Sequence, residues 1–271
     1  MSKRQASRLT EQQIRGGGPR EIFGKVARVH DDAVADASEA AFDLLAKTYP
    51  ELKFRMRESI AKSEINSRLK SLDARLGETL FVKEASIKPD GGLIEVLDKS
   101  GNWRIILVSE AKHQGKDVEN IKAGILVGKN KDQDLMVAGN AIERVHKNIN
   151  EIRNAMLGEL HFPYVVFLQG SNFETSTFEV LRPDGRAVTI SHDKGNMNRI
   201  DRVSAANYCM KINENHCKNI ILEEDGKKIM LQAASLYARS EELAREEMVG
   251  IMVVVAETSL SVLSEELPWG K

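Results

Sequence analysis

The sequence predicts an α/β protein in which a mixed central β-sheet is flanked by helices. Three observations lead to this class: apolar residues at helical spacing, β-branched runs separated by turn residues, and one continuous apolar run. Helix and strand patterns alternate along the chain, which is typical of α/β folds. With 271 residues, 42% hydrophobic and 29% charged, the chain can bury a large core, and we expect residues 29–271 to form one domain.

Residues 1–28 are predicted to form a basic N-terminal arm. They contain seven basic residues against two acidic ones, although the whole chain has a formal net charge of -1. Three glycines and a proline at positions 16–19 interrupt any continuous helix there. Taken alone, this composition fits a solvated tail as well as it fits an arm that grips phosphates, with Arg4 and Arg8 as candidate contacts.

The elements after the arm follow from apolar periodicity. Helical spacing predicts two amphipathic helices, one carrying Val34, Ala37, Ala41, Leu44 and Leu45 and the next carrying Ile65, Leu69 and Leu72. Residues 93–96 and 103–108 are apolar runs around turn residues at 98–102, which predicts a hairpin. Residues 164–168 read as a strand buried on both faces, and residues 178–181 and 187–190 read as a second hairpin.

The first hairpin carries the candidate catalytic residues. Asp90 lies just before its first strand and Glu110 near the end of its second, so antiparallel pairing brings the two carboxylates together at the open end. Lys112 follows two residues later, which places it on the same face as Glu110 with Ala111 pointing away. A turn followed by a solvated strand face would give the same pattern.

A metal-dependent phosphodiester-cutting site is the functional interpretation of these residues. Asp90 and Glu110 would bind Mg²⁺, which prefers carboxylate and phosphate oxygens. Lys112 would orient the attacking water or stabilise the transition state. Whether Lys112 acts as the base stays open, because carboxylates and a bound metal shift its pKa in opposite directions.

A second candidate constellation lies on a later helix. Ile142, Val145, Ile149, Ile152 and Met156 form an apolar stripe that belongs in the core. Asn140 lies near the helix start and Arg144 four residues on, so both share a face away from the stripe. Asn can bond adenine and Arg can fork onto guanine in the major groove. For a generic helix, however, a cap at Asn140 and a surface pair of Arg144 with Glu143 or Asn148 is the better explanation.

Several stretches of this chain resemble the EcoRI family of type II restriction endonucleases, from about Leu9 to Leu263. The stretches that carry the resemblance are Ser86-Ile87-Lys88-Pro89-Asp90-Gly91-Gly92, Glu110-Ala111-Lys112-His113-Gln114-Gly115-Lys116-Asp117, Gln133-Asp134-Leu135-Met136, Ala138-Gly139-Asn140-Ala141-Ile142-Glu143-Arg144, Asn198-Arg199 and Asp201-Arg202. The resemblance implies the PD-(D/E)xK nuclease fold with a DNA-gripping arm. It also implies a homodimer that uses Mg²⁺ to cut double-stranded DNA at the palindrome GAATTC after the G, leaving a 5′ overhang and restricting foreign DNA.

The resemblance also implies roles for individual residues. Base contacts would come from Met136, Val137, Ala138, Gly139, Asn140, Ala141, Arg144, Arg199 and Arg202, and backbone contacts from Lys88, His113, Lys116, Arg4 and Arg8. Val137 stands where one member of the family has Ala, and its larger side chain would tighten or block an apolar contact at the outermost base pair. His113 fits a polar strand-to-helix junction equally well.

Other functions are less compatible with the residues. The longest apolar run, at 251–256, is too short to span a bilayer, and no apolar stretch follows the basic start as in a secretory signal. Together with two cysteines that lack metal-site spacing, this predicts a cytoplasmic protein without a membrane partner. The segment at 124–130 lacks the spacing and the Ser or Thr of a phosphate-binding loop, so we expect no nucleotide cofactor. A sequence-specific DNA-binding protein that does not cut and a structure-specific repair nuclease remain as alternatives.

Overall fold

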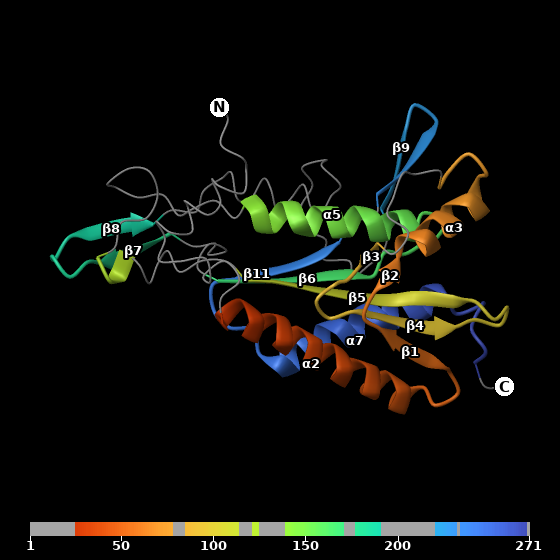
Figure 1. Cartoon of the computed structure of the whole chain (residues 1–271), viewed down its shortest axis with the longest axis horizontal. Coiled ribbons are helices and arrows are strands. Elements are labelled where there is room, and N and C mark those ends of the chain that lie inside the picture. The colour runs from red at the N-terminus through yellow and green to blue at the C-terminus, as the bar shows by residue number, and fades with distance from the viewer. Residues whose placement is uncertain are drawn as a thin grey trace.

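A five-stranded mixed sheet between two helical layers forms the body of the computed structural model (Figure 1). The structure describes residues 25–77, 85–113, 121–124, 139–170, 177–190, 220–231 and 234–269. In spatial order the strands are β1 (Phe54–Arg57), β4 (Leu93–Leu97), β5 (Trp103–His113), β6 (Tyr164–Gln169) and β11 (Ser235–Arg239). The predicted α/β class with a mixed sheet is therefore confirmed.

The sheet changes from antiparallel to parallel pairing at β5. On one side β4 pairs antiparallel with both β1 and β5, and on the other side β6 pairs parallel with both β5 and β11. The 11-residue strand β5 extends beyond its pairing with β4. Val108 is paired with Leu93, the first residue of β4, while β5 continues to His113 beside β6. The end of β5 therefore projects beyond the hairpin and next to the residues that precede β4.

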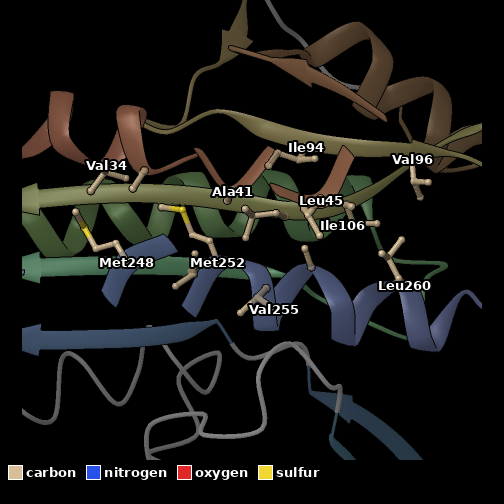
Figure 2. Packing of buried hydrophobic residues seen from close by; sticks show 14 of the residues in the cluster. Val34, Ala41, Leu45, Ile94, Val96, Ile106, Met248, Met252, Val255 and Leu260 are labelled. Atoms are coloured by element: carbon tan, nitrogen blue, oxygen red, sulfur yellow. The ribbon is translucent and has the colours of Figure 1, made fainter. Parts of the chain in front are cut away.

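Helices α2 (Lys25–Thr48) and α7 (Arg245–Val262) cover one face of the sheet (Figure 1). Figure 2 shows how their side chains meet those of β4 and β5 in a cluster that includes Val34, Ala41, Leu45, Ile94, Val96, Ile106, Met248, Met252, Val255 and Leu260. All ten are buried, and because burial of apolar area contributes about 25 cal/mol per Å², this layer is a main source of the fold's stability. The long helix α2 begins at Lys25, so Lys25 and Arg28, the last basic residues of the expected arm, are helical.

The opposite face is covered by α3 (Lys62–Leu72) and α5 (Gly139–Ala155). The predicted stripe of α5 is confirmed at Val145, Ile149 and Ile152, which are fully buried, and at Met156 just past the helix end. This packing decides which side of α5 turns away from the sheet.

Two apolar residues of the predicted amphipathic helices are not buried, Leu44 of α2 and Leu72 of α3. Leu44 is 44% exposed, because it neighbours the buried Leu45 and consecutive helical side chains point about 100° apart. Leu72 is 51% exposed, because it is the final residue of α3 and projects past the core.

The remaining strands form two-stranded ribbons. The predicted second hairpin is confirmed as β7 (Phe178–Leu181) and β8 (Ala187–Ile190). A further hairpin joins β9 (Ile220–Glu224) to β10 (Lys227–Leu231) through Asp225 and Gly226, both at positive φ, as a two-residue type I′ turn requires. The short strands β2 (Ile60–Ala61) and β3 (Ser86–Ile87) pair just ahead of the turn that carries Asp90. Among the described residues, no helix is both long enough and apolar enough to cross a membrane.

Candidate active site

A tight turn before β4 presents Asp90. The Gly92 amide donates to the Pro89 carbonyl at 3.1 Å, and Gly92 has φ +74, a conformation that favours glycine. The turn is tied to β5 on both sides, since the Gly91 amide donates to Ser109 O at 3.0 Å and the Ser109 amide donates to Gly92 O at 3.2 Å. Asp90, the residue before Gly91, is therefore held beside Glu110, the residue after Ser109.

The ammonium of Lys112 joins the two carboxylates. Its Nζ atom lies 2.5 Å from Asp90 Oδ2 and 2.6 Å from Glu110 Oε1, and it also donates to the Ala111 carbonyl at 2.5 Å. The Ala111 amide donates to Asp90 Oδ2 at 3.2 Å, while the Ala111 side chain is buried in the cluster under α2 and α7. The alternation expected along β5 is thus confirmed: Glu110 and Lys112 share a face and Ala111 points away.

Glu110 is a buried carboxylate with neutral hydrogen-bond donors on two elements. Its side chain is 1% exposed, Asn148 Nδ2 of α5 donates to Oε1 at 3.0 Å, and the Tyr164 hydroxyl of β6 donates to Oε2 at 3.1 Å. Burial raises the pKa of Glu110 to about 7, with the Lys112 ammonium opposing the rise and Asp90 adding to it. The same burial, next to a carboxylate, raises the pKa of Tyr164, so its hydroxyl keeps its proton.

Lys112 is a cation in this arrangement. Burial lowers the pKa of Lys112, but the charges of Glu110 and Asp90 outweigh burial and leave it above its usual value. The sequence left open the direction in which the pKa of Lys112 shifts, and in the metal-free site that shift is upward.

The donor set fits a hard divalent cation. Asp90 Oδ2 and Glu110 Oε1 approach one ammonium nitrogen together, so both oxygens reach a single cationic position. In the described parts of the chain, no group of three or more His, Cys, Asp or Glu side chains is arranged to hold a metal. The protein's share of such a site would thus be two carboxylates, and phosphate oxygens and waters would complete the coordination sphere, as is usual for Mg²⁺.

Two of the expected backbone-contact residues lie near this centre. Lys88 is exposed, immediately precedes Pro89, and donates to Glu58 Oε2 at 2.7 Å. His113 ends β5, and its ring lies edge-on to that of His30 with centroids 6.2 Å apart. The other three, Lys116, Arg4 and Arg8, lie outside the described residues.

Some of the expected base-reading residues lie in the described part of the chain and others do not. Gly139, Asn140 and Ala141 open α5, which agrees with a helix starting near Asn140, and Arg144 is exposed one turn later. Met136, Val137, Ala138, Arg199 and Arg202 lie outside the described residues.

The site also contains residues that sequence reasoning did not assign to it. Asn148 and Tyr164 donate hydrogen bonds to Glu110. Asp31 of α2 lies close enough to interact electrostatically with Asp90 and Lys112. Burial raises the pKa of Asp31 to about 6, with Asp90 adding to the rise. Asn148 was detectable, because it continues the four-residue spacing of Asn140 and Arg144.

Comparison with known proteins agrees with this geometry. The family model described as "Restriction endonuclease EcoRI" matches residues 16–269. The chain is 54% identical over 265 residues to the type II restriction enzyme RsrI of Cereibacter sphaeroides, covering 98% of this chain and 96% of that one. It is 53% identical over 268 residues to the type II restriction enzyme EcoRI of Escherichia coli, covering 98% and 97%. A match over nearly the whole chain, together with a lysine joining two carboxylates at the end of β5, shows that the protein belongs to the EcoRI family of type II restriction endonucleases.

Proposed function

We propose that this protein uses Mg²⁺ to cut double-stranded DNA at the palindrome GAATTC, after the G, leaving a 5′ overhang. The observation that carries the proposal is the convergence of Asp90 and Glu110 on the Lys112 ammonium, within 2.6 Å. The family resemblance in the sequence implies the site and the position of the cut. Its biological role would be the restriction of foreign DNA in the cytoplasm.

The protein's residues would act as follows. Asp90 and Glu110 would hold Mg²⁺, which neutralises charge on the scissile phosphate and lowers the pKa of a bound water. Asn148 and Tyr164 fix the orientation of Glu110 through one hydrogen bond to each carboxylate oxygen. Lys112 remains a fixed cation beside the phosphate and stabilises charge that develops in the transition state.

Base recognition would come from the segment that enters α5 and from a separate segment. Asn140 and Arg144 would read adenine and guanine through paired hydrogen bonds, together with residues 136–139 and Ala141 and with Arg199 and Arg202. The exposed position of Arg144, with the apolar stripe of α5 buried on the other side, supports this assignment. Residues 1–28 would form the arm that holds the DNA backbone through Arg4 and Arg8, with Lys88, His113 and Lys116 as further backbone contacts, and residues 29–271 would form a single nuclease domain.

A two-fold homodimer would match the symmetry of the site. A palindromic duplex offers two identical half-sites, and a symmetric pair of subunits presents the same residues to each. Each subunit would then cut one strand.

The two alternatives make different predictions. A DNA-binding protein that does not cut would not need Asp90, Glu110 and Lys112 in contact. A structure-specific repair nuclease would have no use for base readers on a helix. Digestion of a plasmid of known sequence with Mg²⁺ or with EDTA discriminates all three functions: we expect fragments that end at GAATTC with Mg²⁺ and intact plasmid with EDTA. Bound but uncut plasmid, or cutting that follows DNA structure instead of sequence, would contradict the proposal.

A further inference from the structure

Two buried serine hydroxyls meet behind the turn that carries Asp90. Ser38 of α2 and Ser109 of β5 are each 1% exposed, and their Oγ atoms lie 2.5 Å apart. Ser38 also lies 3.7 Å from Met252 Sδ of α7, to which it can donate, which leaves Ser109 to donate to Ser38. The serine pair therefore joins the helix layer to the strand that carries Glu110.

The backbone of Gly91 rests directly on this pair. A Cβ atom at position 91 would lie 2.3 Å from Ser109 Oγ and 2.9 Å from Ser38 Oγ, distances at which one of the groups has to move. The Gly91 amide also donates to the carbonyl of Ser109 at 3.0 Å. The turn is thus in contact with both hydroxyls on one side.

The same turn carries the Asp90 carboxylate. Its Oδ2 atom accepts from the Ala111 amide at 3.2 Å and from Lys112 Nζ at 2.5 Å. The serine pair and these acceptor contacts thus meet the same turn at neighbouring residues, Gly91 and Asp90. A change of even a few tenths of an ångström in the separation of α2 and β5 would consequently move the turn and Asp90 relative to Glu110.

We propose that Ser38 and Ser109 are positioning residues that set the height of the Asp90 turn above β5 and so hold Asp90 within reach of the cation that it shares with Glu110. The inference rests on the proposed function, in which Asp90 is a metal ligand. The hydroxyl pair suits this task, because a hydrogen bond fixes the separation of two elements more narrowly than a contact between methyl groups does. Groups that orient a metal ligand typically change metal affinity about 10- to 100-fold when they are removed.

Metal affinity, measured without catalysis, tests the proposal. Tb³⁺ is a hard, oxygen-seeking cation whose luminescence can be excited through a nearby tyrosine, and Tyr164 donates to Glu110. We expect Ser109→Ala and Ser38→Ala each to weaken Tb³⁺ binding about 10-fold or more. Because the hydroxyls act as a pair, the double variant should be no weaker than the single variants.

A matched control is available at a serine of α7 that contacts the same strand. Ser259 of α7 is also fully buried, and its hydroxyl donates to Ile106 O of β5 at 3.0 Å and to Val255 O of its own helix at 3.1 Å. Ser259→Ala makes the same hydroxyl-to-methyl change and should leave Tb³⁺ affinity at the wild-type value. Melting temperatures of all variants show whether any loss of affinity follows a general loss of stability.

Asp90→Asn distinguishes a failure of the metal-ligand role from a failure of the positioning role. If Asp90→Asn leaves Tb³⁺ affinity unchanged, the metal-ligand role in the proposed function is wrong. If Asp90→Asn weakens binding while Ser109→Ala and Ser38→Ala match Ser259→Ala, the positioning role of the serine pair is wrong and the proposed function stands. If the loss of Tb³⁺ affinity in the double variant equals the product of the two single losses, the two hydroxyls act independently and the proposed pair is wrong.

Discussion

Asn148 donates its side-chain amide to Oε1 of Glu110, 3.0 Å away. This hydrogen bond joins α5, whose first turns carry the proposed base readers, to a carboxylate of the candidate active site. Asn140, Arg144 and Asn148 follow one another at four-residue spacing, so they form one ridge of the helix. A shift of α5 on DNA binding would therefore move a group that touches Glu110 directly.

We predict that Asn148→Ala slows cleavage about 10- to 100-fold at saturating enzyme, because Glu110 loses the donor that orients Oε1. Asn148→Asp should be slower still, since it places a second negative charge beside Glu110. Asn150→Ala is the matched control: Asn150 lies on the same helix, is exposed, and accepts a hydrogen bond from Arg153. Single-turnover rates measure the effect, and a wild-type rate for Asn148→Ala would show that the contact is dispensable.

We predict that Glu110→Ala and Lys112→Ala each abolish cleavage while site-specific binding survives, and that Asp90→Asn behaves alike. The physical reason is that the proposed catalytic groups lie on β5 and the turn before β4, whereas the proposed readers lie on α5 and a separate segment. Gel shifts in metal-free buffer measure binding, and circular dichroism checks the fold. Loss of binding in step with loss of cutting would refute this division of labour.

We predict that the metal-free protein loses stability as pH rises from about 4.5 to about 7. Burial raises the pKa of Glu110 from its ordinary value of 4.5 to about 7, so in this window the folded state holds a proton that the unfolded chain has released. Each pKa unit corresponds to ~1.4 kcal/mol, which puts the loss on the order of 3 kcal/mol. Above about pH 7 the contribution is constant.

Chemical denaturation in EDTA at several pH values measures this loss. Glu110→Gln should flatten most of the decline, because its amide does not titrate. Asp31, with a pKa raised to about 6 by burial and then by Asp90, adds a decline of the same sign. A decline of equal size in Glu110→Gln and in the wild type would show that Glu110 is not its main source.

We predict that Arg144→Lys impairs cutting and relaxes discrimination among DNA sites, because an ammonium cannot reproduce the planar fork of guanidinium on base edges. Each bidentate contact is worth roughly 1–3 kcal/mol, and a dimer would lose it at both half-sites. Binding to every single-base variant of GAATTC measures the change. By contrast, Arg8→Gln in the arm should weaken binding to all DNA alike and flatten its salt dependence. If Arg144→Lys lowered affinity equally for all these DNA variants, Arg144 would be a phosphate contact and not a base reader.

We predict that the active unit is a two-fold dimer, because a symmetric pair of subunits matches a palindrome. Sedimentation of the free protein and of its complex with a GAATTC duplex measures the mass. A monomer in both states would refute this prediction.

Local patterns in the sequence predicted how the three candidate catalytic residues lie relative to one another. The alternation of a strand places Glu110 and Lys112 on one face, and a hairpin brings Asp90 beside Glu110, so both relations follow from backbone geometry over about twenty residues. Apolar periodicity likewise predicted α2, α3 and α5, and turn chemistry predicted the β7–β8 hairpin. The Asp225-Gly226 turn is an equally local signal that predicts β9 and β10, and it was missed.

By itself, then, the sequence determined the α/β class, the chain segments of the main elements and the identity of the three catalytic candidates. Only the tertiary structure decided what surrounds them. The Asn148 and Tyr164 contacts with Glu110 join residues 38 and 54 positions apart, and the Ser38–Ser109 pair joins residues 71 positions apart. Such contacts depend on which face each helix packs against and on the register between β5 and β6. Those are properties of the packed core as a whole, because many side chains must be buried at once before any one of these pairs is brought together.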